Sequence, residues 1–338
     1  ELRGAVIVTA QATPSFTTQM FGVAAGGLAV AASVAEINYM PWVKATVGDV
    51  AIDAGSLQVD ARVNKLSGDD NNFTGEATGS AGALVGITAT QTDLYIGDES
   101  TVADSRQMIV RAGVDSDSAI VIDDAIAVGS NVKFTADIDS SAYAGGIVAG
   151  GAAISRARAQ YRSEAYLGGT GSVTAGSLAV GASSDPKLVV RATAGSGGVL
   201  AGAGLETKTG IDSSVVARVG SVPTSNTDAT LWASENSANT INITGIEGVT
   251  ISANTRNSVN GYGDVFSGGA IGGSGSADHH SVNATTLAGT GDDVDLNAGN
   301  LVVTAAGFVG KVNGTDSEAN IDATTGGIAA AAGGVGSL

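Results

Sequence analysis

Hydrophobic and polar residues alternate along short segments of the chain, and this two-residue period is typical of β-strands that bury one face. The alternating segments are rich in Val, Ile and Thr, are bounded by Gly, Asn, Asp or Ser, and lie at residues 48–55, 56–63, 132–138, 187–194, 248–254 and 300–307. Helix signals are weak, because Gly recurs every few residues and no cap is followed by a helical period. The pattern therefore predicts an all-β chain.

An apolar–polar–Ala triplet recurs along the chain and marks a degenerate repeat. The triplets lie at residues 8–10, 59–61, 110–112, 134–136, 190–192, 251–253 and 303–305. Between them lie about six Gly/Ala-rich segments, such as VAAGGLAVAAS at 23–33 and AGGIVAGGAAIS at 144–155. Together they indicate a repeating unit of about 50 residues.

A unit of this length and strand content predicts a parallel β-helix, or β-solenoid, in which successive coils stack and share one core. About two coils fit each unit, with Gly at the corners and the Gly/Ala-rich segments where backbone layers approach closely. A series of antiparallel sandwich domains is the alternative. No Trp or Tyr core anchor recurs, however, and the unit is too short for a sandwich. We expect a single continuous solenoid over residues 1–338.

Residues 20–35 (MFGVAAGGLAVAASVA) lie in a stretch without charge between Arg3 and Glu36, long enough to cross a bilayer. Membrane spans depend on Leu, Ile and Phe, whereas this run consists mainly of Ala and Gly. It is also the first of the six equivalent segments, and the others are interrupted by Gly pairs, polar residues or charges. We expect no membrane span.

The formal net charge of −17 argues against nucleic acid as a partner, because nucleic-acid binding needs a positive surface. The chain contains no Cys, which excludes disulfides and thiolate metal sites and suits an exported protein. No signal peptide opens the sequence, so an exported protein would be represented here by its mature form or an interior piece.

The sequence IDAGSLQVDA, then a Gly/Ala-rich segment, then LYIGDESTV and a further triplet, resembles the repetitive shafts of large bacterial adhesins of the filamentous-haemagglutinin type. The resemblance covers nearly the whole chain. It implies a right-handed parallel β-helix, a secreted or cell-surface location, a structural or adhesive role and no catalytic residues. The block at 108–132 is shorter than the pattern, and the secretion domain expected at an adhesin's N-terminus is missing.

Carboxylates gather in turn-like segments and are candidate calcium ligands, because hard oxygen donors in flexible turns suit Ca²⁺. The candidates are Asp115, Asp117, Asp292, Asp293 and Asp295. Asp115 and Asp117 would share one strand face, as would Asp293 and Asp295. Solvated turns are the alternative, and no EF-hand spacing occurs. We expect no required cofactor, with calcium as the one candidate.

His279 and His280 are neighbours, so on a strand they would point to opposite faces and not form a joint metal site. Asp278 could orient one ring, although exposed loop histidines are the favoured interpretation. Arg156 and Arg158 would share a strand face and either pair locally or meet an acidic face of a neighbouring subunit. Tyr39, Trp42 and Trp232 are expected to cap solenoid ends or loops.

No nucleophile elbow, P-loop or zinc-protease helix occurs, so we expect no enzyme. The predicted function is a secreted or surface-attached structural β-solenoid, either an adhesin shaft or a subunit of an extracellular filament or matrix. The expected partners are further copies joined end to end or neighbouring parts of a larger adhesin, with surface glycans as another candidate. A β-helix that binds or cleaves polysaccharide is the alternative.

Overall fold

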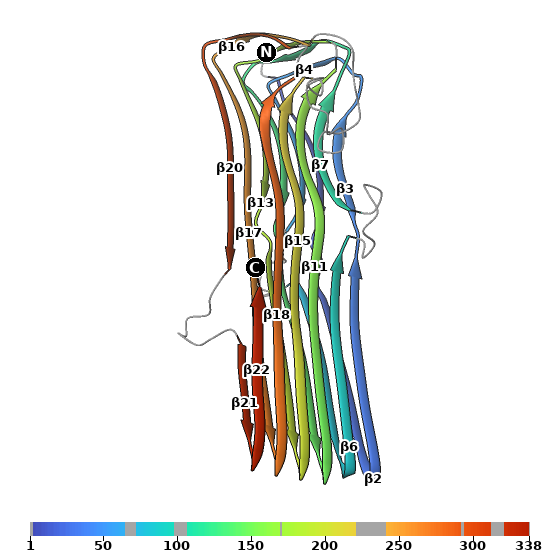
Figure 1. Ribbon diagram of the computed structural model, residues 1–338. Helices are drawn as coiled ribbons and strands as arrows, with labels where there is room; N and C mark the ends of the chain where they lie inside the picture. Colours follow the sequence, from blue (N-terminus) through green and yellow to red (C-terminus); the bar gives the residue numbers. More distant parts are fainter. Residues whose placement is uncertain are drawn as a thin grey trace.

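The computed structural model describes residues 3–64, 72–97, 107–169, 171–220, 241–291, 294–311 and 321–337. Over these residues the chain forms β-strands without a helix, and the strands pair in parallel. They wind through six successive coils that stack side by side (Figure 1). The prediction of an all-β chain with parallel strands is confirmed, and the arrangement is consistent with a parallel β-solenoid. No described segment forms a helix long and apolar enough to cross a membrane. Residues 20–35 lie inside a strand.

The first coil contains β1 (Ala5–Ala12), β2 (Phe16–Tyr39), β3 (Trp42–Val47) and β4 (Ile52–Ala54). The second contains β5 (Ser56–Val63), β6 (Phe73–Ile96), β7 (Met108–Asp115) and β8 (Ile120–Ile122). The third contains β9 (Ala125–Val132), β10 (Thr135–Gly145), β11 (Val148–Gly168) and β12 (Ser172–Thr174). The fourth contains β13 (Ser177–Ser184), β14 (Lys187–Gly197), β15 (Leu200–Val219) and β16 (Ile241–Ile246). The fifth contains β17 (Gly248–Gly268), β18 (Ile271–Thr290) and β19 (Val294–Ala298). The sixth contains β20 (Leu301–Lys311), β21 (Ile321–Gly326) and β22 (Ala329–Ser337).

The strand register gives the length of each coil. Ala5 pairs with Ser56, 51 positions later, and Leu57 pairs with Ile126, 69 positions later. The next steps are 52, 71 and 52 positions, from Ala125 to Ser177, from Ser177 to Gly248 and from Val249 to Leu301. Short and long coils therefore alternate. Each sequence unit forms one large coil, so the prediction of about two coils per unit was wrong.

Each coil is flattened into two long layers (Figure 1). The first layer holds β1, β5, β9, β10, β13, β14, β17, β20, β21 and the early parts of β2 and β6. The second layer holds β3, β7, β11, β15, β18, β22 and the later parts of β2 and β6. A separate five-stranded sheet of β4, β8, β12, β16 and β19 closes the end opposite the narrow turns.

The wider part of the coil is filled by aliphatic side chains from both layers and from the short sheet, because alternate residues of each strand point inward. Val59, Val128, Val180 and Ile251 occupy one register position on four successive strands and are at most 2% exposed. An aromatic series also crosses the core, with Phe16, Phe73, Phe134 and Tyr161 each within 6.2 Å of the next ring centroid. Tyr39 packs against Phe16 and Phe73 in the first coil.

The narrow part of the coil is formed by the Gly/Ala-rich segments, which turn from the first layer to the second. Here the two backbones nearly touch: a Cβ on Gly151 would lie 2.7 Å from the carbonyl oxygen of Gly195 in the opposite layer. Between the layers small polar groups pair, as where the Ser140 hydroxyl donates to Thr92 Oγ1 at 2.9 Å. The prediction that these segments mark close backbone layers is confirmed.

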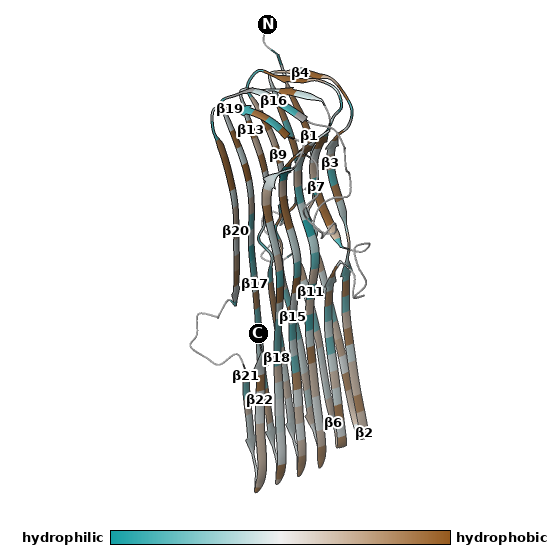
Figure 2. Ribbon diagram, turned by 45° about the horizontal axis from the view of Figure 1, so that its top comes forward, coloured by the Kyte–Doolittle hydropathy of each residue, from teal (hydrophilic) through white to brown (hydrophobic). Residues whose placement is uncertain are grey.

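Both ends of the stack leave the interior of the coil uncovered. Val303 occupies the same register position as the buried Ile251 but is 44% exposed. At the other end Phe16 is 43% exposed, whereas Phe73, its partner in register, is fully buried. Figure 2 shows hydrophobic residues along β20 at one edge of the stack. Among the described strands, the outermost one at each end has a partner strand on one side only.

Candidate functional site

The candidate calcium ligands are dispersed. Asp115 ends β7, Asp117 lies in the turn that follows, and Asp295 lies on β19 in the short sheet. Asp49, which was not predicted from the sequence, lies beside Asp117. Its Oδ1 accepts hydrogen bonds from the Asp117 backbone amide at 3.2 Å and the Ser118 hydroxyl at 2.9 Å. Asp292 and Asp293 lie outside the described residues. Within the part of the chain that is described, no three acidic or histidine side chains cluster for a metal ion. Calcium binding stays a prediction.

The two histidines lie on β18 and point to opposite faces, as predicted. His279 lies on the outer face, where its Nδ1 is 2.7 Å from Ser337 Oγ. His280 points inward and is 5% exposed, so the expectation of exposed loop histidines was wrong for this residue. The error arose because the segment around it is rich in Gly and Ser, which suggested a loop, whereas β18 continues through it.

Asp278 orients the buried His280 ring, with 2.8 Å between Asp278 Oδ2 and His280 Nε2. Asp278 also accepts hydrogen bonds from Thr207 Oγ1 at 2.6 Å and Lys311 Nζ at 3.4 Å. Burial alone would raise the pKa of the Asp278 carboxyl, but the hydrogen bonds from His280 and Thr207 and the nearby positive charges outweigh it, so the pKa lies below its usual value. Gly261 in the facing layer leaves the space that the carboxylate occupies.

We predict that Asp278→Asn lowers the free energy of unfolding at neutral pH by about 1–3 kcal/mol, because it removes charged hydrogen bonds. A carboxyl with a depressed folded-state pKa stabilises the fold above its unfolded pKa of about 4, and this contribution disappears as pH falls through the folded pKa. Urea unfolding at pH 7 and at acidic pH should therefore show a smaller acid loss in the variant. Asp264→Asn, on the exposed outer face, is the control; an equal change there would contradict the role of Asp278.

A buried ion cluster lies across β7, β11 and β15. Glu164 is fully buried, with its Oε2 2.9 Å from Arg111 Nε and its Oε1 3.4 Å from Arg218 Nε. The Arg218 guanidinium lies over the Tyr166 ring, 4.6 Å from its centroid. That ring occupies the space above Gly113, where any Cβ would overlap it. These ion pairs link β7, β11 and β15, because the charged groups of the three strands face one another.

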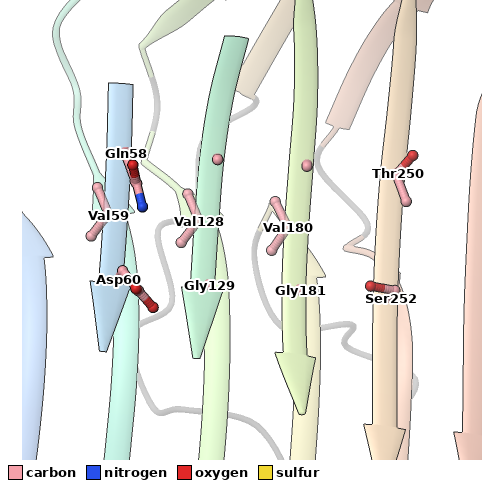
Figure 3. A pocket seen from close by; sticks show the side chains of 11 residues that line it. Gln58, Val59, Asp60, Val128, Gly129, Val180, Gly181, Thr250 and Ser252 are labelled. Carbon is pink, nitrogen blue, oxygen red and sulfur yellow. The ribbon is translucent and has the colours of Figure 1, made fainter. Parts of the chain in front are cut away.

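A shallow trough crosses the outer face of the first layer (Figure 3). Gln58 and Asp60 on β5 stand on one side, and Thr250 and Ser252 on β17 on the other. Between them β9 and β13 carry only Ala and Gly outward, which leaves a volume of about 290 Å³. The one charged group at the trough, Asp60, pairs with Arg62. The trough offers amide, carboxylate and hydroxyl groups for hydrogen bonds.

A larger hollow of about 480 Å³ lies on the outer face of the second layer, around Gly210 of β15. Its polar lining comes from four neighbouring strands and comprises Tyr95, Arg156, Arg158, Lys208, Asp212 and Ser281. Arg156 and Arg158 share this face, as predicted, and they pair locally: Arg156 with Glu206 at 2.9 Å and Arg158 with Asp212 at 3.6 Å. Sequence reasoning missed Lys208 and Tyr95, which only the strand register brings to these arginines.

The sequence-predicted aromatic positions divide between core and surface. Tyr39 lies in the first coil among the core aromatic rings, in agreement with a cap at the end of the solenoid. Trp42 is 61% exposed, with Lys44 Nζ 4.9 Å from its ring centroid. Trp232 lies outside the described residues.

Comparison of the chain with protein-family models, with curated proteins and with solved structures finds no match.

Proposed function

We propose that this chain is a structural, non-catalytic part of a secreted or surface-attached solenoid that extends by stacking further coils on its open ends. The observation that carries the proposal is the exposed interior at both ends of the stack. Val303 and Phe16 would be buried by one more coil at each end, as their partners in register are. Unpaired strand edges invite such pairing.

The large coil favours a filament or matrix subunit over a long adhesin shaft. Neighbouring strands lie about 4.8 Å apart, so a coil of 51 to 71 residues adds only about that much length along the stack. The 21 residues of β11, in contrast, span roughly 70 Å across the stack at about 3.3 Å per residue. Each coil therefore adds much more to the width of a flat face than to the length of the stack.

We predict that Val303→Asp abolishes association of the purified chain while leaving its own fold intact, because a carboxylate would enter the interior that a further coil must cover. Thr304→Asp places the same charge on the neighbouring, outward-facing position and should not change association. Negative-stain electron microscopy and sedimentation, each with calcium and then with chelator, measure the outcome.

Ribbons roughly 70 Å wide are expected for the wild-type chain and for Thr304→Asp. Loss of these ribbons in chelator would indicate that the candidate calcium ligands take part in association. Compact, roughly spherical particles in every sample would contradict the proposal, as would ribbons that persist in Val303→Asp.

A further inference from the structure

We infer that the hollow around Gly210 binds a carboxylate-bearing sugar, a uronic acid unit within an acidic polysaccharide. This binding activity goes beyond the structural role proposed above and depends on a different part of the molecule.

The first observation is the charge of the hollow. The whole chain has a net charge of −17 and only 16 Lys and Arg residues. Three of these, Arg156, Arg158 and Lys208, line a single hollow. Glu206 offsets Arg156 and Asp212 offsets Arg158, so among the described residues Lys208 is the cation of the hollow that has no ion pair. A cation without a counter-charge on an otherwise acidic surface attracts an anion to its own position.

The second observation is the register of the cations. Arg156 pairs in register with Lys208, so two cationic side chains stand side by side on β11 and β15. Like charges directly opposite one another on neighbouring strands are destabilising. Arg156 is offset by Glu206, but Lys208 makes no ion pair with any described residue. A bound carboxylate would supply its counter-charge.

The third observation is the shape of the site. Gly210 lies in register between Arg158 and Ser281, and its missing side chain opens the floor of the hollow. The volume of about 480 Å³ is within the range of small-ligand sites, about 300–1,000 Å³. Arg158 and Lys208 can donate charge-assisted hydrogen bonds to a carboxylate. Asp212 and Ser281 offer partners for hydroxyl groups, and the Tyr95 ring forms part of the wall.

The position on an open sheet face favours a unit within a polymer over a small free molecule. The hollow lies on the outer face of β6, β11, β15 and β18, which belong to the second to fifth coils, so it is away from the open ends of the stack. A polysaccharide can therefore lie across the strands and continue on either side of the site.

The test uses isothermal titration calorimetry of the full chain with short oligogalacturonides as the probe. Lys208→Gln removes the cation without an ion pair, and Gly210→Val fills the floor. A Cβ at Gly210 would meet only Arg158 Cγ, at 3.7 Å, so no backbone atom stands in the way of a side chain that starts at this position. Lys133→Gln is the matched control, because it removes the same charge from an exposed position outside the hollow. Neutral dextran, dextran sulfate and poly-glutamate are the comparison ligands.

We expect the oligogalacturonides to bind the wild type and Lys133→Gln equally. Lys208→Gln should weaken binding about tenfold, the loss of one charge-assisted hydrogen bond, and Gly210→Val should abolish it. Absence of binding to the wild type would overturn the inference, as would an equal loss in Lys133→Gln or equal affinity for neutral dextran. Tighter binding of dextran sulfate would indicate that the ligand is a sulfated sugar. Preference for poly-glutamate would indicate that it is an acidic protein. Either result overturns the uronate assignment. Circular dichroism of each variant separates loss of the site from loss of the fold.

Discussion

Glu164→Ala should lower the free energy of unfolding by about 3–5 kcal/mol, the loss expected when one partner of a buried ion pair is removed. The Glu164 carboxylate is fully buried, and Arg218, which it faces, is only 2% exposed. Without the carboxylate, the Arg218 guanidinium stays buried, and among the described residues its partners are then the Tyr166 ring and the Gly220 carbonyl. Urea unfolding followed by circular dichroism measures the change.

Glu206→Ala is the control for this prediction. Glu206 pairs with Arg156 at 2.9 Å, but both side chains are about one-third exposed. Solvent-exposed ion pairs contribute about 0–1 kcal/mol, so the control should remain within about 1 kcal/mol of the wild type. Equal losses in the two variants would show that burial does not distinguish the two pairs and would contradict the packing around Glu164.

Gly151→Ala should lower the free energy of unfolding by about 1–3 kcal/mol, because a single added methyl group forces the two layers apart. Its Cβ would lie 2.7 Å from the Gly195 carbonyl oxygen and 3.3 Å from that of Ala142, both in the facing backbone. Neither carbonyl belongs to a flexible side chain, so the backbone itself must move. Thermal and urea unfolding measure the loss.

The neighbouring glycine provides the control. Gly150 points outward, and a Cβ there would have only the Gly202 carbonyl within reach, at 4.0 Å. Gly150→Ala should be neutral or slightly stabilising, because alanine loses less conformational freedom on folding than glycine. If Gly150→Ala proved as damaging as Gly151→Ala, the close contact between layers would not be the cause.

The sequence pattern predicted the strands and their stacking because both depend on local signals. Alternation in segments such as 56–63 and 248–254 fixes which side chains face the core, and the six Gly/Ala-rich segments correctly mark equivalent turns. The number of coils per unit could not be obtained in this way. A two-residue period shows that a strand exists but not how far it continues, and β2 and β6 run for 24 residues each.

The sites were only partly predictable, because register brings together residues that are far apart in the chain. Arg156 and Arg158 are two residues apart, so their shared face followed from strand geometry. Lys208 joins them from 50 or more positions away, once β11 and β15 are aligned. The same holds for Glu164, whose partners Arg111 and Arg218 lie 53 and 54 positions away. A change of one residue in coil length would separate these groups.

Disulfide trapping between introduced cysteines tests the coil length most directly, and the chain contains no native Cys to interfere. Ser141 on β10 and Thr193 on β14 are partners in register, 52 positions apart on the outer face. Neighbouring strands place such pairs within the Cα separation that a disulfide needs, about 4.4–6.8 Å. Asp137 lies on the same face of β10 but about 13 Å further along the strand.

The account predicts that oxidation of the double variant Ser141→Cys/Thr193→Cys joins the two peptides within one molecule nearly completely, as read by mass spectrometry after proteolysis. The double variant Asp137→Cys/Thr193→Cys should form little of this bond. Efficient cross-linking of the second pair, or no cross-linking of the first, would contradict coils of this length and with them the stacked parallel fold.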